Sequence, residues 1–259
     1  MIDVALLGAT GRMGVAILQA WRSAPDLRLV GALASSRSSW LRRDAGEVCG
    51  LGSFDVRVSD DPDVALESAH VAIDFTIAQA SARNLDACLR RNCALVLGVT
   101  ALEETFVVRL RAAAQRIAIV RSPNMSLGVN VCFALAARAA RVLGTYEVEI
   151  VDRHHRHKRD APSGTALRFG ELISNVRTAT QPDAKAGGVG YASVRADEVA
   201  GEHTVLFRNS SEQVEITHRA NGRAAYAAGA LAAARWACGQ APGLYGMHDV
   251  LGLEAPPQG

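Results

Sequence analysis

The sequence predicts an α/β protein with a doubly wound parallel sheet, joined to an α+β domain with a mixed sheet. In the first half, short apolar runs alternate with helical patterns, and a glycine-rich loop follows the first run. In the second half, apolar and polar residues alternate with a period of two, which is typical of a sheet with one solvated face. We expect a Rossmann-like dinucleotide-binding domain at 1–124, a substrate-binding and oligomerisation domain at 125–238, and a C-terminal segment at 239–259 that packs back on the first domain.

The first-half elements follow from the lengths of the apolar runs. Continuous apolar strands separated by helices indicate parallel pairing with right-handed crossovers, and ligands bind such sheets at the carboxyl ends of the strands. The expected strands are 4–7, 27–33, 71–75, 94–99 and 117–120, and the expected helices are 15–22, 78–91 and 102–116.

The second half has a different pattern. Alternation at 146–150 and 214–218 predicts strands. Helices are expected at 131–143, 165–176 and 223–237, the last ending at Gly239 as a C-cap. The segment 181–190, rich in Gly and Pro, is expected to be a loop.

Composition excludes several classes of function. The chain has 259 residues and a net charge of +2, which gives no basic stripe for nucleic acid. No apolar stretch is long enough to cross a bilayer, and the N-terminus carries no basic leader. The five cysteines are scattered without metal-ligand spacing. We therefore expect a cytoplasmic protein that binds neither membrane nor nucleic acid.

The loop after the first strand predicts a dinucleotide site. Glycines allow the backbone to approach a pyrophosphate, and the helix that follows offers N–H groups and a partial positive charge. A bare turn is the alternative, but the position between strand and helix favours the nucleotide. The loop residues are Gly8, Ala9, Thr10, Gly11, Arg12, Met13 and Gly14.

The end of the second strand indicates which cofactor is preferred. Many Rossmann proteins have an acidic residue there for the ribose hydroxyls, but this chain has Ala34, Ser35, Ser36 and Arg37. Two hydroxyls and a guanidinium suit a 2′-phosphate, which favours NADPH over NADH. Arg37 as an ordinary solvated charge is the alternative.

A basic cluster follows the strand that begins at Tyr146. It runs from Asp152 to Asp160, includes three histidines, and leads into Ser163-Gly164-Thr165 at a helix start. Hydroxyls and first-turn N–H groups suit a carboxylate, so the expected partner is a small dicarboxylate. A metal is not expected, because adjacent histidines point in different directions; a solvated charged loop is the other alternative.

Lysine is scarce in this chain, which makes its position informative. Of the 28 Lys and Arg residues only Lys158 and Lys185 are lysines. A lysine can give up its proton, whereas an arginine stays charged. Histidine and lysine beside an anion site could transfer a proton after a hydride adds to a conjugated C=N bond.

These motifs together resemble the dihydrodipicolinate reductase family. The resemblance is carried by His154-His155-x-x-Lys158-x-Asp160-Ala-Pro-Ser163-Gly164-Thr165-Ala166, by VAIDFT at 71–76, by the blocks at 98–100, 124–130 and 189–207, and by the helix at 223–236. It implies an NAD(P)H-dependent oxidoreductase that reduces 4-hydroxy-tetrahydrodipicolinate or dihydrodipicolinate to tetrahydrodipicolinate in lysine (diaminopimelate) biosynthesis. It also implies a homotetramer built through the sheets of the substrate domain.

The resemblance assigns roles residue by residue. It implies that His154 donates or accepts a proton and that Lys158 donates one. The implied substrate-carboxylate residues are His155, Ser163, Gly164 and Thr165. The implied cofactor residues are Gly8 to Met13, Gly98, Val99, Thr100, Ser122, Pro123, Asn124 and Met125.

Two other functions are alternatives. A short-chain dehydrogenase would carry Tyr-x-x-x-Lys, and no tyrosine here has a lysine four residues later. A non-catalytic NADP(H)-binding regulator would most plausibly have lost Lys158 or the Ser-Gly-Thr turn, and both are present. The sequence therefore favours an enzyme.

Overall fold

The computed structural model describes residues 1–180, 188–196 and 199–253. It divides into two compact units, the first comprising Met1–Ser126 and Tyr226–Leu251, the second comprising the described residues of 127–225 together with 252–253. Most of the loop expected at 181–190 lies outside the described residues.

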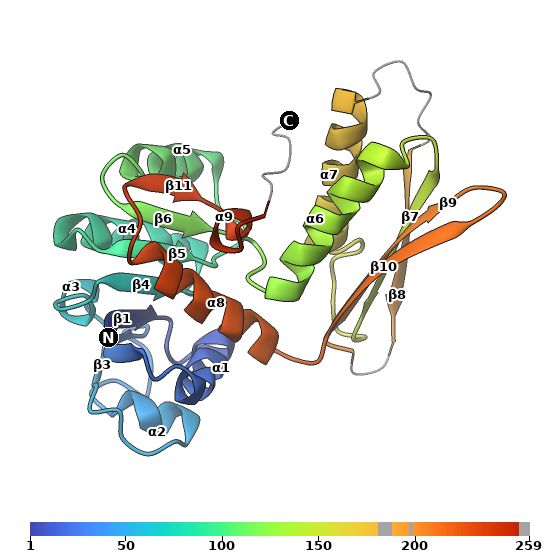
Figure 1. The fold of residues 1–259 in the computed structure, drawn as a ribbon. Helices are drawn as coiled ribbons and strands as arrows, with labels where there is room; N and C mark the ends of the chain where they lie inside the picture. Colours follow the sequence, from blue (N-terminus) through green and yellow to red (C-terminus); the bar gives the residue numbers. More distant parts are fainter. Residues whose placement is uncertain (181–187, 197–198, 254–259) are drawn as a thin grey trace. The chain divides into compact units, whose positions relative to one another are not determined.

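The first unit contains a seven-stranded sheet in which every pairing is parallel. The order is β11-β6-β5-β4-β1-β2-β3, visible in Figure 1. Without β11 this is the Rossmann order, in which connections reverse between β1 and β4. The strands are β1 (Ile2–Leu7), β2 (Leu27–Leu33), β3 (Val58–Ser59), β4 (Val71–Asp74), β5 (Ala94–Leu97), β6 (Ala118–Arg121) and β11 (Gly243–Tyr245). The predicted doubly wound fold is confirmed.

Helices connect these strands and supply the core. The three predicted helices appear as α1 (Arg12–Ala20), α4 (Ala78–Arg91) and α5 (Glu104–Ala113). Three short helices were not predicted: α2 (Ala45–Cys49), α3 (Pro62–Ala65) and α9 (Met247–Val250). A 3-10 turn at Trp21–Ser23 follows α1. Leu85 and Cys88 on α4 and Leu110 on α5 pack with the buried strand residues in one hydrophobic cluster. Continuous burial along β1 and β4 explains why those strands read as unbroken apolar runs.

The helix α8 (Ala224–Ala237) differs from the expected domain boundary, because from Tyr226 onward it belongs to the first unit. Arg235 pairs with Asp26 at 2.6 Å, and the Trp236 ring packs edge-on against Tyr245 on β11. An alanine-rich helix fits against either sheet, so its sequence does not indicate which. Gly239 also lacks the positive φ of a left-handed C-cap.

The second unit contains a four-stranded mixed sheet, as predicted. Its order is β10-β9-β7-β8, with β7 and β8 parallel and the other pairs antiparallel. The strands are β7 (Glu147–His154), β8 (Val189–Arg195), β9 (Gly201–Arg208) and β10 (Gln213–Ala220).

Two helices, α6 (Leu127–Val142) and α7 (Gly164–Thr180), lie side by side on one face of this sheet (Figure 1). Phe169 of α7 is fully buried with Ile150 of β7 and with Val205 and Phe207 of β9. Residues two apart on one strand point to the same face of a sheet, and the buried residues of β7 and β9 lie on the face that meets the helices. The same face extends to the ends of the strands, where polar side chains replace apolar ones.

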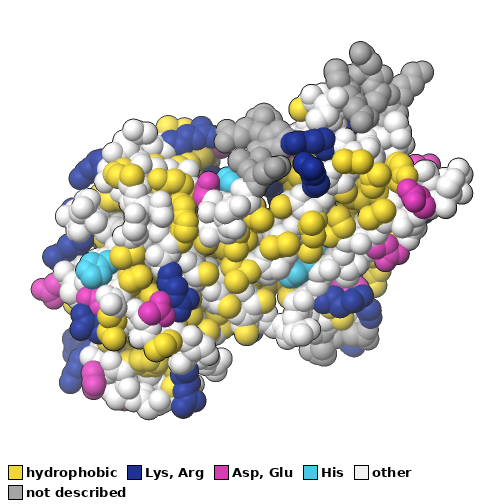
Figure 2. Space-filling model, in the orientation of Figure 1, with side chains coloured by type: hydrophobic (Ala, Val, Ile, Leu, Met, Phe, Trp, Pro, Cys, Tyr) yellow, Lys and Arg dark blue, Asp and Glu magenta, His cyan; other side chains and the backbone are white. Residues whose placement is uncertain are grey.

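In the part of the chain that the structure describes, no helix is both long and apolar enough to cross a bilayer. On the face drawn in Figure 2, Lys and Arg side chains are interspersed with Asp and Glu and form no continuous basic stripe. This distribution agrees with the nearly neutral net charge of +2.

Candidate functional site

The carboxyl ends of the parallel strands bring the expected cofactor residues of the first unit together. The backbone N–H of Gly8 donates to Leu33 at the end of β2, at 2.9 Å, and that of Phe75 donates to Leu7 at the end of β1, at 3.0 Å. Likewise Gly98 N–H donates to Asp74 at 2.9 Å. The glycine loop and the loops after β4 and β5 thus form one continuous edge.

Glycine is required at particular positions of this edge. A Cβ on Gly14 would lie 2.2 Å from the carbonyl oxygen of Gly8, and one on Gly98 would lie 2.4 Å from the ring of Phe75. Gly8 itself has a φ of +88°. The N-cap of α1, Gly11, provides no side-chain acceptor, and the first turn contains no acidic residue. The helix start therefore has no negatively charged side chain to repel a phosphate.

Asp74 fixes the turn that ends β4. Its carboxylate is fully buried and accepts hydrogen bonds from the Thr76 N–H at 2.8 Å, the Thr76 hydroxyl at 2.6 Å and the Asn84 amide at 2.9 Å. Burial raises the pKa of this carboxyl, and the hydrogen bonds from Thr76 and Asn84 oppose the rise. The network holds Phe75 against the glycine loop, a role that the sequence analysis did not foresee.

The loop after β2 presents the residues expected to select the cofactor. Ala34 is buried, while Ser35, Ser36 and Arg37 are exposed. The Ser35 hydroxyl accepts from the Arg37 N–H at 3.3 Å, which closes a tight turn. The loop after β6 is also internally bonded, since the Ser122 hydroxyl donates to the Asn124 carbonyl at 2.7 Å.

In the second unit, strand register brings a second group of residues together. Asp152 of β7 pairs directly with His203 of β9, and His154 pairs with Arg195 of β8. Asp152 and His154 continue the helix-facing series of Val148 and Ile150, so a carboxylate and an imidazole stand where apolar residues would be expected.

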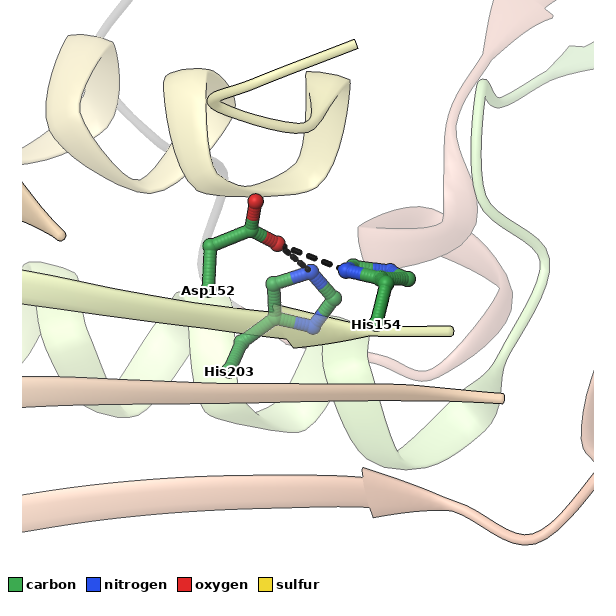
Figure 3. A group of neighbouring side chains, drawn as sticks. All are labelled: Asp152, His154 and His203. Atoms are coloured by element: carbon green, nitrogen blue, oxygen red, sulfur yellow. Dashed lines mark ion pairs between the residues drawn. The ribbon is translucent and has the colours of Figure 1, made fainter. Parts of the chain in front are cut away.

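Asp152 lies at the centre of this group (Figure 3). One carboxylate oxygen, Oδ1, lies 2.9 Å from Nδ1 of His154 and 3.3 Å from Nε2 of His203. The other, Oδ2, accepts from the Arg195 guanidinium at 2.7 Å and from the Ser163 N–H at 2.9 Å. Asp152 is fully buried, and His154 and His203 are nearly so.

Ser163 is the N-cap of α7. Its hydroxyl accepts from the Ala166 N–H at 3.2 Å and lies 3.1 Å from Nε2 of His203. The cap uses the serine side chain; the next residue, Gly164, is exposed and donates its N–H to Asp160, and Thr165 is half-buried. The predicted carboxylate-binding turn is therefore attached to the same buried anion as His154.

The electrostatics of the group follow from its burial and contacts. Burial alone would raise the pKa of the Asp152 carboxyl, but hydrogen bonds from His203, Arg195 and Ser163 outweigh it and hold that pKa well below its usual range. Burial lowers the pKa of His154 from 6.5 to about 4; Asp152 opposes the change, and the charges of Lys158 and Arg195 add to it. At neutral pH the group is an ionised carboxylate beside a neutral imidazole.

The remaining predicted residues lie outside this buried group. His155 is half-buried, and its N–H donates to the Val199 carbonyl at 2.8 Å. The Lys158 ammonium pairs with Asp160 at 3.0 Å and retains 22% exposure of its side chain, so it is accessible to a small molecule. His154 therefore belongs to the buried group and the adjacent His155 does not, as expected because adjacent side chains point in different directions.

By donor type and spacing, Asp152, His154 and His203 could also ligate a metal, since one donor atom of each lies within 4.8 Å of the others. Arg195 already offsets the carboxylate charge at 2.7 Å, which leaves little net attraction for a cation. The expectation of no metal stays a prediction.

Sequence reasoning missed Asp152, His203 and Arg195 as site residues. Asp152 could have been found, because it continues the buried phase of the alternating strand. His203 and Arg195 come from strands that the periodicity analysis had not placed, and only pairing with β7 brings them to Asp152.

Both halves of the chain match models of a known protein family. Residues 2–125 match the family model for the N-terminus of dihydrodipicolinate reductase, and residues 128–251 match the model for its C-terminus. The 4-hydroxy-tetrahydrodipicolinate reductase of Syntrophotalea carbinolica is 43% identical over 98% of this chain and 100% of its own length. The Myxococcus xanthus enzyme of the same name is 43% identical over 98% and 99%.

Among solved structures, a dipicolinate-bound dihydrodipicolinate reductase from Paenisporosarcina sp. TG-14 has a TM-score of 0.78 at 23% identity, covering 96% of this chain and 99% of that one. An amine dehydrogenase from Mycobacterium smegmatis has a TM-score of 0.60 at 14% identity over 99% and 97%. These similarities show the fold, while the sequence matches identify the lineage. The chain belongs to the dihydrodipicolinate reductase family.

Proposed function

We propose that this chain is an NAD(P)H-dependent 4-hydroxy-tetrahydrodipicolinate reductase of the diaminopimelate route to lysine. The observation that carries the proposal is the attachment of a neutral, buried His154 to the Ser163-Gly164-Thr165 helix start through one carboxylate. Such a group places proton transfer next to a dicarboxylate-binding turn.

The nicotinamide cofactor supplies a hydride when it is bound. Its pyrophosphate would lie against the loop from Gly8 to Met13, where a Cβ at Gly14 has no room. The loops at 98–100 and 122–125 lie at the carboxyl ends of β5 and β6, where a dinucleotide binds such a sheet. We assign them to the cofactor.

NADPH is the cofactor that the loop after β2 suits better. Arg37 is exposed beside two serine hydroxyls, and buried Ala34 cannot hold a ribose diol. A guanidinium can pair bidentately with a phosphate. Cofactor preference therefore depends on Arg37.

The substrate carboxylates are assigned to the start of α7. Gly164 has no neighbouring atom within 4 Å of a built Cβ, which leaves room for a ligand at this turn. Thr165 adds a hydroxyl, and His155 and Lys158 add polar or positive groups nearby in sequence. The Ser163 hydroxyl caps the helix, so it stabilises the turn in addition to any contact that it makes with a ligand.

Proton transfer is assigned to His154 and Lys158. Hydride addition to the conjugated imine leaves an electron-rich enamine, which must take up a proton at carbon before release. The Lys158 ammonium can give up a proton, and the neutral His154 can accept one. Asp160, 3.0 Å from the Lys158 ammonium, holds that side chain at the loop.

The assembly is proposed to be a homotetramer formed through the sheets of the second unit. The two edge strands of this sheet each expose a valine: Val194 on β8 is 41% exposed, and Val214 on β10 is 38% exposed. Exposed apolar residues at sheet edges are typical of sites where other chains pair. Light scattering of the purified protein measures the assembly.

The activity is tested by oxidation of NADPH or NADH, followed at 340 nm, with the imine generated in place by its synthase. Imine-dependent oxidation is expected with both cofactors, and kcat/KM should be higher with NADPH. Arg37→Ala should raise KM for NADPH much more than for NADH. Arg22→Ala, which removes an exposed arginine elsewhere in the first unit, is the matched control. No imine-dependent oxidation would refute the function, and equal effects on both cofactors would refute the role of Arg37.

A further inference from the structure

We propose that Asp152 is a positioning residue, whose buried carboxylate selects the His154 tautomer with hydrogen on Nδ1 and at the same time fixes the start of α7. The importance of this arrangement for turnover rests on the proposed function. The arrangement itself involves only residues of the second unit.

A carboxylate at this position needs a reason. Asp152 is fully buried on the face of β7 that also buries Val148 and Ile150. An ionised carboxylate in such surroundings destabilises the fold unless several donors compensate it. An apolar residue would continue the pattern of the strand, so the retained charge points to a role other than packing.

The two carboxylate oxygens face different parts of the site. Oδ2 accepts hydrogen bonds from two groups that can only donate, the Arg195 guanidinium at 2.7 Å and the Ser163 backbone N–H at 2.9 Å. Oδ1 is left for the two imidazoles, with His154 Nδ1 at 2.9 Å. One anion thus links the start of α7 to the ring of His154.

This contact determines which ring nitrogen carries the hydrogen. His154 is neutral at pH 7, since burial lowers its pKa to about 4. Nδ1 and the anionic Oδ1 lie 2.9 Å apart without hydrogen-bond geometry, so their interaction is electrostatic, and it stabilises the neutral imidazole with its hydrogen on Nδ1. Its Nε2 then has a free lone pair and can accept a proton.

His203 restricts the arrangement further. Its Nε2 lies 3.3 Å from Asp152 Oδ1 and 3.1 Å from the Ser163 hydroxyl, and its ring packs edge-on against His154 with centroids 5.0 Å apart. Besides these groups, Lys158 and Arg195 act electrostatically on His154, and His218 of β10 interacts with His203. Asp152 is the one anion among them in the described part of the chain.

The tautomer can be measured without turnover. Protein labelled with ¹⁵N-histidine gives distinct Nδ1 and Nε2 chemical shifts for each tautomer, and the His154 signals are assigned by their loss in His154→Gln. At pH 7 the wild-type ring should carry hydrogen on Nδ1. A wild-type His154 with hydrogen on Nε2 would overturn the proposal, whether or not the protein reduces an imine.

Asp152→Asn tests the cause. Because Arg195 and the Ser163 N–H both donate to the Oδ2 position, the amide oxygen of the variant should occupy it, so the amide NH₂ faces His154 and favours hydrogen on Nε2. We expect this tautomer change together with a kcat about 10–100-fold lower, as for other orienting partners of histidine, while NADPH affinity stays within about twofold. Glu171→Gln, which removes an exposed carboxylate from α7, is the matched control.

Two outcomes of this variant contradict the proposal: an unchanged His154 tautomer, or an unchanged kcat. Loss of NADPH affinity in the same proportion as kcat would indicate that the variant is generally unfolded. If Asp152→Asn does not fold, the wild-type tautomer still decides the question. Absence of reductase activity in the wild type would refute the proposed function but leave the tautomer result standing.

Discussion

Removing His154 should change how the stability of the protein depends on pH. The buried imidazole has a pKa lowered from 6.5 to about 4, whereas in the unfolded chain it titrates near its ordinary value. Between these two values the unfolded chain binds a proton that the folded chain does not. The free energy of unfolding therefore rises with pH across this window and falls on acidification.

The size of the effect follows from the same values. At pH 5, one and a half units below the ordinary histidine pKa, protonation stabilises the unfolded chain by about 2 kcal/mol, and at pH 7.5 by almost nothing. Asp152 adds little in this range, because its carboxyl is ionised in both states above its usual pKa of 3.8. From pH 7.5 to 5, wild-type stability should fall by about 2 kcal/mol more than that of His154→Gln.

Urea unfolding at the two pH values, followed by far-UV circular dichroism so that the second unit with His154 is observed, measures this difference. His157→Gln removes an exposed imidazole from the same loop and should keep the wild-type pH dependence. The acid limb that His154 causes in kcat/KM should likewise lie well below pH 6.5. Equal losses of stability in wild type and His154→Gln would show that the folded imidazole titrates normally, and the reasoning from burial would be wrong.

Three further predictions concern the chemistry and the loops. Lys158→Arg keeps the charge but removes the transferable proton, so kcat should fall by about 10² or more with near-normal cofactor affinity; nearly full kcat with a raised KM for the imine would mean that Lys158 only binds. Pyridine-2,6-dicarboxylate should inhibit competitively with the imine, and a crystal soak that shows it away from Gly164 and Thr165 would contradict the substrate assignment. Gly14→Ala, with a Cβ 2.2 Å from the Gly8 oxygen, should lower stability by about 1–3 kcal/mol and weaken NADPH binding in a fluorescence titration, whereas Gly239→Ala, with open space around it, should do neither.

Much of the candidate site was predictable because its residues are adjacent in sequence. The glycine loop lies between a strand and a helix, and the segment from His154 to Thr165 ends one strand and begins one helix. Local chemistry is enough to recognise both. The C-terminal part was harder, because nothing in the alanine-rich α8 or the three-residue β11 specifies which sheet it joins.

By itself the sequence determined the two sheet types, and it singled out the glycine loop, His154 and Lys158 as candidate site residues, because apolar periodicity and short motifs are properties of neighbouring residues. Only the tertiary structure decided what surrounds His154. Asp152 and His203 are separated by about fifty residues and meet because β7 and β9 pair in a register that places them opposite each other. The Ser163 N–H, at the start of α7, donates to the same carboxylate. The protonation state of His154 depends on burial and on these contacts, which arise from folding and are not encoded in any single segment.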